Sequence, residues 1–266
     1  MKLNVCLAGA TGWAGSELAR GIAAVNDLTL VSAVSRKHAG RTLGTVLGDG
    51  RLETPVFASA AEALARPCDV FVEYTTAASA KRNVLAALSA GAHVVVGASG
   101  LTDTDYAEID AVARERARGV LACGNFALTM VLLQKFAELA ARYLPTWEII
   151  DYAYEGKPDA PSGTARELAA RMAKVRRPEI GIPVANTLGQ PEARGAELSG
   201  SRVHSLRLPG FVLGAEVIFG MPDQTLTLRH DAGSSAKPYV DGALLAIRKV
   251  STLVGVHRGL DAVLEL

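Results

Sequence analysis

Short apolar runs alternate with amphipathic segments of helical length through the first 125 residues of the chain. Runs of this length are typical of buried strands, and their regular alternation with helices is typical of a parallel sheet covered on both faces. The predicted strands are Leu3–Ala8, Leu28–Ser35, Val56–Phe57, Asp69–Tyr74, His93–Gly97 and Val120–Cys123. The predicted helices are Trp13–Ala24, Ala60–Leu64, Ala77–Ala90 and Thr104–Ala117, and the glycine-rich stretch 40–50 is predicted to be irregular.

The pattern changes after residue 125. A long apolar helix comes first, and three segments near the C-terminal end, joined by short breaks, predict an antiparallel meander. The predicted elements are the helix Phe126–Tyr143, the strand Trp147–Tyr154, the helix Thr164–Val175, a long loop over Pro178–Gly200, the strands Arg202–Leu208, Val212–Phe219 and Gln224–Ala232, and the helix Lys237–Val254.

These elements predict an α/β protein with two domains. We expect residues 1–125 to form a Rossmann-like, doubly wound parallel sheet that binds a dinucleotide. We expect residues 126–236 to form an α+β domain with a mixed or antiparallel sheet, for substrate binding and oligomerisation. Residues 237–266 are expected to pack back on the first domain.

Composition narrows the class of protein. Hydrophobic residues make up 49% of the chain, charged residues 21%, and the formal net charge is +1. This balance favours no nucleic-acid or membrane partner. The first apolar run is too short for a signal peptide, and no run approaches the ~20 residues that span a bilayer, so we expect a cytoplasmic protein. The three cysteines have no metal-ligand spacing, and we expect reduced thiols and no metal.

A glycine turn follows the first predicted strand and opens the first predicted helix. Gly9, Gly12 and Gly15 form the pattern G-x-x-G-x-x-G. Such glycines permit a tight turn, a close approach of the backbone to a pyrophosphate, and close packing of the helix on the strand. We therefore expect a dinucleotide at this turn, with further contacts from its other residues, Thr11, Trp13 and Ala14.

The end of the second predicted strand indicates the type of dinucleotide. An NAD site commonly carries an acidic residue there, whereas this chain has Ser35-Arg36-Lys37. The two cations and the hydroxyl suit a 2′-phosphate, so we expect NADPH, with a turn that accepts NADH as the alternative. The strand-end loops that contain Thr75 and 97–100 are expected to line the nicotinamide half of the cofactor.

The segment Lys157–Ala165 is the second candidate site. Ser162, Gly163 and Thr164 come after a proline turn and open a helix, where hydroxyls and free backbone N–H groups attract an anion. Lys157 adds a positive charge just before them. The chemistry predicted from these residues is the binding of a small-molecule carboxylate; a simple helix cap is the alternative.

The motif Lys157-x-Asp-Ala-Pro-Ser-Gly-Thr-Ala resembles the signature of the dihydrodipicolinate (4-hydroxy-tetrahydrodipicolinate) reductases of the diaminopimelate route to lysine. The likeness extends to the glycine turn and to 96–100, 124–126 and 203–207. It implies an NADPH-dependent reductase, typically a homotetramer assembled through its second domain. It implies that Lys157, Ser162, Gly163 and Thr164 bind substrate carboxylates. It also implies that the dinucleotide contacts Gly9, Gly12, Ala14, Ser35, Arg36, Gly97, Ser99, Gly124, Asn125 and Phe126.

The chain departs from this family at one place. The family pattern Glu-x-His-His-x-x-Lys is replaced by Asp151-Tyr-Ala153-Tyr154-Glu-Gly-Lys157. The first histidine of the pair is the family's usual proton donor, and Ala153 cannot take that role. Lys157, Tyr154 or an ordered water is then the candidate donor, and the two side chains would need lowered pKa values because both ordinarily titrate near ~10.

Four functional hypotheses follow. The first is the lysine-pathway reductase with an altered proton donor, and the second is a divergent relative that reduces another imine or unsaturated acid. The third is a semialdehyde dehydrogenase, which the glycine turn also resembles and which would use Cys123 as its nucleophile. The fourth is a non-catalytic protein that binds NADPH or a metabolite.

Overall fold

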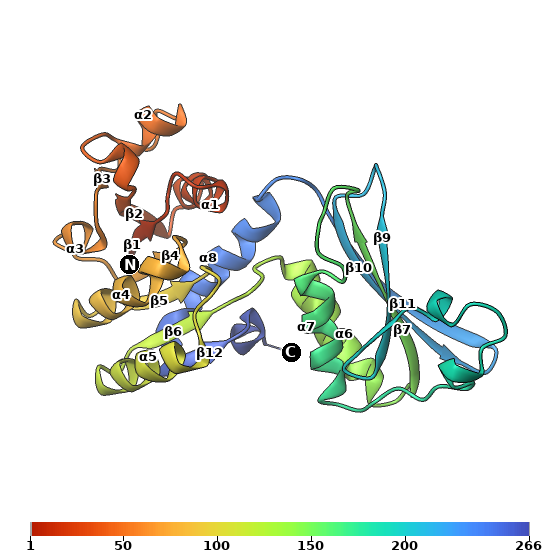
Figure 1. The fold of residues 1–266 in the computed structure, drawn as a ribbon. Helices are drawn as coiled ribbons and strands as arrows, with labels where there is room; N and C mark the ends of the chain where they lie inside the picture. Colours follow the sequence, from red (N-terminus) through yellow and green to blue (C-terminus); the bar gives the residue numbers. More distant parts are fainter. Residues whose placement is uncertain (1, 266) are drawn as a thin grey trace. The chain divides into compact units, whose positions relative to one another are not determined.

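Two sheets organise the chain, and each lies in its own structural unit. The computed structural model describes residues 2–265. One unit contains the chain up to Leu128 together with the segment from Ala236 onward, and the other is Thr129–Ser235. Figure 1 labels the elements of both units. No helix in the described part of the chain has the length and apolar character required to cross a bilayer.

The described part of the first unit contains a seven-stranded sheet in the order β12-β6-β5-β4-β1-β2-β3, with every pair parallel. Its strands are β1 (Leu3–Ala8), β2 (Leu28–Val34), β3 (Val56–Phe57), β4 (Val70–Glu73), β5 (His93–Val96), β6 (Gly119–Ala122) and β12 (Gly255–Arg258). The order reverses between β1 and β4, which is where ligands bind in open α/β sheets. The predicted Rossmann-like parallel sheet is confirmed.

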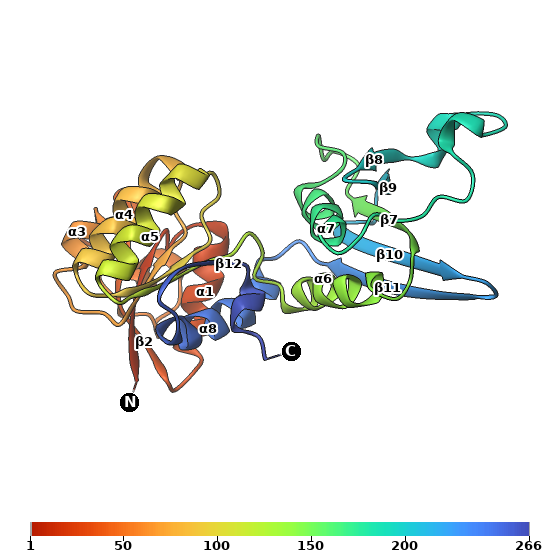
Figure 2. The ribbon, with the colours of Figure 1, turned by 90° about the horizontal axis from the view of Figure 1, so that it is seen from below.

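Helices cover both faces of this sheet. They are α1 (Trp13–Ala23), α2 (Leu43–Leu47), α3 (Ala60–Ala63), α4 (Ala77–Ser89), α5 (Asp103–Glu115) and α8 (Val240–Lys249), with the 3₁₀ turns η1 (Arg36–His38), η4 (Lys237–Tyr239), η5 (Val250–Thr252) and η6 (Leu260–Val263). Figure 2 shows α3, α4 and α5 on one face and α1 with α8 on the other. The central strands β4 and β6 are buried throughout, as strands covered on both sides must be.

Two expectations for the first unit are wrong. The stretch 40–50 is not irregular throughout, because it contains α2, which Thr42 caps by accepting a hydrogen bond from the Thr45 N–H and which ends at Gly48 in the left-handed conformation. The predicted helix 237–254 is divided into η4, α8 and η5, and the chain continues into β12 beside β6. A strand of four residues that includes Gly255 leaves too short a pattern to detect.

The described second unit contains a five-stranded mixed sheet in the order β11-β10-β7-β9-β8. Its strands are β7 (Thr146–Ala153), β8 (Ala196–Leu198), β9 (Ser201–Arg207), β10 (Leu213–Met221) and β11 (Gln224–Ala232). Its helices are α6 (Leu128–Ala141) and α7 (Gly163–Ala173), and the expected loop 178–200 contains the 3₁₀ turns η2 (Val184–Asn186) and η3 (Pro191–Arg194) as well as β8. The predicted mixed sheet is confirmed.

The predicted meander of the last three strands is wrong. Only β10 and β11 form a hairpin, whereas β9 lies parallel to β7, which separates it from β10. The reason is visible in the side chains, because Ser205 and Arg207 of β9 bond to the buried Asp151 of β7. An electrostatic partner on a distant strand therefore decides the pairing.

The two faces of the second sheet differ. Alternate side chains of β7, including Trp147, Ile149 and Ala153, are buried on the face that α6 and α7 cover. Thr129 of α6 also hydrogen-bonds His230 of β11, with 3.0 Å between the hydroxyl and Nδ1. The opposite face, which carries Tyr152, has no covering helix among the described residues.

The packing of the glycine turn yields a stability prediction. A Cβ at Gly15 would lie 2.1 Å from the backbone oxygen of Gly9, and neither backbone segment can move without displacing β1 or α1. We expect Gly15→Ala to lower the free energy of unfolding by about 1–3 kcal/mol, the usual cost of overpacking. Gly50→Ala is the matched control, because nothing lies within 4 Å of its added Cβ. Urea unfolding followed by circular dichroism measures both, and equal stability of the two variants would contradict the packing argument.

Candidate functional site

The glycine turn lies at the carboxyl end of β1, beside the end of β4. Gly9 has φ +81°, and a Cβ there would stand 2.4 Å from the carbonyl oxygen of Tyr74, so the position requires glycine. Helix α1 then begins at Trp13 without any side-chain cap on Gly12. The first backbone N–H groups of any helix have no acceptor within the helix, and here no side chain caps them either. They are the donors that a pyrophosphate would use.

A cavity of about 630 Å³ lies next to this turn. Four of the predicted cofactor residues line it, namely Gly9, Ser35, Arg36 and Thr75. The Ser35 hydroxyl lies 2.9 Å from the Thr11 hydroxyl, which joins the end of β2 to the turn. Lys37 is exposed in η1 and does not line the cavity. The position beside the glycine turn and the Ser35 and Arg36 side chains in the lining suit the adenosine half of a dinucleotide.

Two other predicted cofactor residues, Gly97 and Phe126, lie against Tyr74, whereas Trp13 is exposed and packs on Tyr239. The rings of Tyr74 and Phe126 lie 5.7 Å apart, and a Cβ at Gly97 would come within 2.9 Å of both rings. Asn125 accepts a hydrogen bond from the Ala127 N–H at 2.8 Å, which shapes the turn that also contains Gly124. Ser99 is exposed in the loop after β5. Burial raises the pKa of the Tyr74 hydroxyl, which has no hydrogen-bond partner among the described residues.

Sequence reasoning missed Glu73, the last residue of β4. Its carboxylate is fully buried and accepts hydrogen bonds from the Thr75 N–H at 2.7 Å, the Thr75 hydroxyl, and Asn83 Nδ2 at 2.9 Å. Burial raises its pKa, and the hydrogen bonds from Thr75 and Asn83 only partly offset that effect. Glu73 thus fixes two side chains that line the cavity. A single acid at the end of an apolar strand gave no signal of this role.

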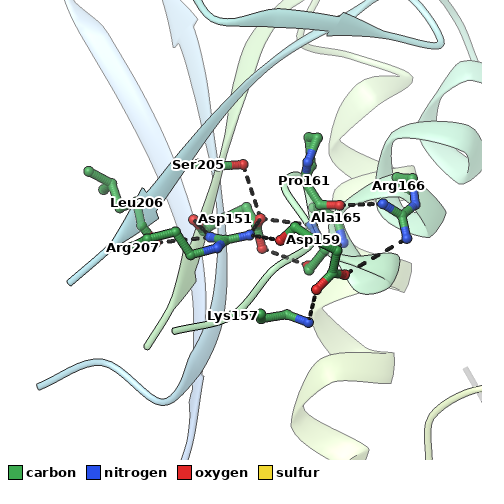
Figure 3. Close-up of polar contacts among 10 residues, drawn as sticks. Asp151, Lys157, Asp159, Pro161, Ala165, Arg166, Ser205, Leu206 and Arg207 are labelled. Carbon is green, nitrogen blue, oxygen red and sulfur yellow. Dashed lines mark hydrogen bonds and ion pairs between the residues drawn. The ribbon is translucent and has the colours of Figure 1, made fainter. Parts of the chain in front are cut away.

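In the second unit the carboxylate of Asp151 is the centre of a buried network (Figure 3). It accepts four hydrogen bonds: from the Ser162 N–H at 2.8 Å, the Ser162 hydroxyl at 2.6 Å, the Ser205 hydroxyl at 3.1 Å and Arg207 Nη2 at 2.8 Å. Burial raises the pKa of Asp151, but the bonds from Ser162 and Arg207 outweigh it and hold the pKa below its ordinary value. The carboxylate is therefore a permanent anion at neutral pH.

Arg207 connects this network to the loop before α7. Its Nη2 also donates to the backbone oxygen of Asp159 at 2.7 Å. Asp159 in turn forms an ion pair with Lys157, and Arg166 lies 3.9 Å from it. The hydrogen bond from Lys157 lowers the pKa of Asp159. These contacts hold the middle of the loop that joins β7 to α7, which carries the predicted carboxylate site.

The donors and acceptors at the start of α7 differ in whether the protein already uses them. The Ser162 hydroxyl donates to Asp151 and accepts from the Ala165 N–H at 3.2 Å, so it is fully used inside the protein. The N–H groups of Gly163 and Thr164 belong to the first turn and have no acceptor within the helix. The structure therefore places Lys157 and the α7 donors in one loop, with Ser162 as their anchor.

The two positions that depart from the family pattern lie just before this loop. Ala153 is fully buried at the end of β7. Tyr154 is 47% exposed, and its hydroxyl makes no hydrogen bond with the described residues. Asp151, Ser205 and Arg207 were not predicted as site residues. The alternation of β9 could have placed Ser205 and Arg207 on one face, but only the pairing with β7 brings Asp151 to them.

Both halves of the chain match models of one protein family. Residues 3–126 match the N-terminal part of dihydrodipicolinate reductase, and residues 129–264 match its C-terminal part. The 4-hydroxy-tetrahydrodipicolinate reductase of Moorella thermoacetica is 39% identical over 266 residues, which cover 99% of this chain and 98% of that protein. The protein of the same name from Geobacillus kaustophilus is 37% identical over 269 residues, with 100% of both chains covered.

The solved structures agree. Dipicolinate-bound dihydrodipicolinate reductase from Paenisporosarcina sp. TG-14 is similar to this chain with a TM-score of 0.88 and 30% identity, covering 99% of this chain and 100% of that chain. An amine dehydrogenase from Mycobacterium smegmatis, with a TM-score of 0.69 and 16% identity, shares the fold alone. The resemblance stated from the motifs is confirmed, and the semialdehyde dehydrogenase hypothesis is wrong.

The buried network around Asp151 predicts a large loss of stability when it is broken. Asp151→Asn keeps the size of the side chain but leaves Arg207 buried without its anionic partner. Removing one member of a buried pair typically costs about 3–5 kcal/mol, and we expect a loss of that size in urea unfolding. Asp231→Asn is the control in the same unit, because the Arg229–Asp231 pair is exposed and should contribute less than about 1 kcal/mol.

The pH dependence follows from the lowered pKa of Asp151. Its stabilising contribution is present above the ordinary aspartate pKa of about 4 and disappears as the pH falls through the lower folded value. The wild-type protein should therefore lose stability below about pH 4 more steeply than Asp151→Asn does. Identical acid unfolding curves for the two proteins would contradict this assignment.

Proposed function

This chain belongs to the dihydrodipicolinate reductase family, and we propose from that membership that it is an NAD(P)H-dependent reductase of the 4-hydroxy-tetrahydrodipicolinate reductase type, acting in diaminopimelate and lysine biosynthesis. The observation that carries the proposal is the start of α7, where the N–H groups of Gly163 and Thr164 have no acceptor within the helix and follow the loop of Lys157 that Arg207 holds through Asp159. The first unit, which carries the glycine turn and the start of α1, supplies the dinucleotide half of such an enzyme.

The substrate proposed is a small cyclic imine or unsaturated carboxylate. Backbone N–H groups at a helix start and a neighbouring ammonium are suited to a carboxylate, because both charge and direction favour an anion there. The proposed carboxylate cradle consists of Lys157, Ser162, Gly163 and Thr164. Ser162 does not contact the carboxylate through its hydroxyl in this proposal; it holds Gly163 and Thr164 in position. The solved relative named above carries dipicolinate, a ring with two carboxylates, which supports a ligand of this chemistry.

The coenzyme proposed is NADPH, with NADH as the alternative. The bound coenzyme would supply the hydride. The Gly9 turn and the uncapped start of α1 fit its pyrophosphate, and Ser35 and Arg36 line the cavity that fits its adenosine. The preference for NADPH is supported by Arg36 in the cavity wall and by the absence of a carboxylate at the end of β2 in the sequence.

The proton must come from a group other than the family histidine. The side chain of Ala153 has no ionisable group. We therefore propose Lys157 or Tyr154 as the catalytic acid, with an ordered water as the alternative. Lys157 is mostly buried and pairs with Asp159, and Tyr154 is half-exposed beside it. If this change has altered the reaction, the chain is a divergent relative that reduces a different imine, or a protein that binds NADPH without turnover.

We also propose a homotetramer assembled through the second unit. The uncovered face of its sheet carries the partly exposed apolar Leu206, and the arm between α7 and β8 holds Ile182 and Leu188, which are 62% and 100% exposed. A fully exposed leucine and an uncovered sheet face are unusual on a monomer and are typical of an interface. We expect a mass of about four times 27.8 kDa by light scattering. A monomer at micromolar concentration would contradict the proposal, and Leu188→Asp should shift the wild-type assembly toward smaller species.

The enzymatic proposal is tested by NADPH oxidation with the substrate made in situ by its synthase. We expect turnover by the wild-type protein and a rise in KM of about ten- to a hundredfold in Lys157→Met, the effect of losing a hydrogen bond to a charged group. Lys174→Met, at the opposite end of α7, is the control and should change neither KM nor kcat.

Two further variants locate the proton donor. Lys157→Arg keeps the positive charge, so it should restore KM, and it should lower kcat by about 100-fold if Lys157 is the acid. Tyr154→Phe should lower kcat similarly if Tyr154 is the acid. Unchanged kcat in both would assign the proton to water. No wild-type turnover above background would contradict the lysine-pathway reaction, and a screen of other cyclic imines would then separate a divergent reductase from a pure binding protein.

A further inference from the structure

A second arginine faces the cavity beside the glycine turn. Arg82 of α4 lines it together with Arg36, which follows β2. Ser59 of α3 and Ser79 of α4 add hydroxyls to the wall. Within the described lining there is no aspartate and no glutamate. The cavity wall is largely apolar, and its charged side chains are two arginines that come from different elements.

Neither of these arginines has a counter-charge among residues 2–265. Among the described residues, Arg36 and Arg82 form no ion pair within 4 Å, and both are exposed. The neighbour Lys81 behaves differently, because its ammonium lies 2.9 Å from Asp105 and 2.8 Å from Glu108. Helix α4 thus neutralises the cation that points away from the cavity and leaves the one that lines it unpaired.

The helix surface around Arg82 leaves room for a ligand. Ala78 and Ala86 lie one turn before and one turn after Arg82 on the same face, and both line the cavity. Asn83, the other polar residue of this stretch, is held by the buried Glu73. The guanidinium of Arg82 is consequently flanked by small side chains and has no protein group to compete for its donors.

Two guanidinium groups on one cavity repel each other unless an anion lies between them. A phosphate monoester carries nearly two negative charges and offers oxygens that match the planar donor pattern of arginine. A site for an unphosphorylated ribose would instead carry a carboxylate, which this cavity lacks. The charge of the cavity therefore selects a phosphomonoester.

We propose that Arg82 is a second specificity-determining residue for the coenzyme. Arg82 binds the 2′-phosphate of NADPH from α4, and Arg36 binds it from the end of β2. This inference rests on the proposed dinucleotide site but adds a residue that the glycine turn and the β2 pattern do not indicate. It makes the preference for NADPH depend on two separate elements, so neither arginine alone sets it.

Calorimetric binding of 2′,5′-ADP and 5′-AMP tests this without turnover. We expect Arg82→Ala and Arg36→Ala each to weaken 2′,5′-ADP binding about tenfold or more, the effect of losing a charge-assisted hydrogen bond, and to leave 5′-AMP binding unchanged. Arg82→Lys should recover part of the loss. Arg116→Ala, at the exposed end of α5, is the matched control and should bind both ligands like the wild type.

The outcomes separate this inference from the proposed function. Wild-type protein that binds NADPH and 2′,5′-ADP supports the dinucleotide site whatever Arg82 does. An equal loss of both ligands in Arg82→Ala would mean that Arg82 contacts the adenine ring, and unchanged binding would mean that it contacts neither group; either result overturns the assignment to the 2′-phosphate. Circular dichroism spectra that match the wild type exclude misfolding of the variants as the cause.

Discussion

The buried ion pair between Asp151 and Arg207 is the interaction on which the second unit depends. One carboxylate accepts hydrogen bonds from the start of α7 and from two side chains of β9, and Arg207 extends the connection to the backbone of Asp159. A buried charge pair is stable only when hydrogen bonds compensate for its lost hydration, and here those bonds join a strand, a loop and a helix start, although Arg207 Nε has no partner among the described residues. The Asp151–Arg207 pair therefore connects the pairing of β9 with β7 to the position of the proposed carboxylate cradle.

The two helices that begin at the proposed sites differ in how many of their first backbone N–H groups are available to an anion. Helix α1 has no side-chain cap after Gly12, so all of its first donors face outward. Helix α7 is capped by Ser162, whose hydroxyl is itself held by Asp151, so only the donors of Gly163 and Thr164 remain available. The first arrangement suits a phosphate that approaches the backbone closely. The second leaves only two backbone donors for an anion. The residues of this helix start match the family motif, although the family's histidine pair is replaced by Ala153 and Tyr154.

Local sequence signals predicted much of this molecule. The parallel strands, the glycine turn and the start of α7 each have a pattern within a few residues, and the structure shows these elements close to the predicted bounds. The pairing of β9, strand β12 and the roles of Glu73, Asp151 and Arg207 could not be read in the same way. Asp151 and Arg207 are 56 residues apart, and the buried position of Glu73 depends on three neighbouring segments. Such features arise from contacts between distant elements, and the alternation along one strand does not identify its partner.

The central claim, that the free N–H groups at the start of α7 hold the substrate carboxylate, is tested most directly by NMR. Amide resonances of the labelled protein would be followed during titration with pyridine-2,6-dicarboxylate. The amide protons of Gly163 and Thr164 should shift downfield as they gain a charged acceptor, whereas that of Ala165, already bonded to Ser162, should move little. Shifts confined to other segments, with Gly163 and Thr164 unchanged at saturation, would contradict the account.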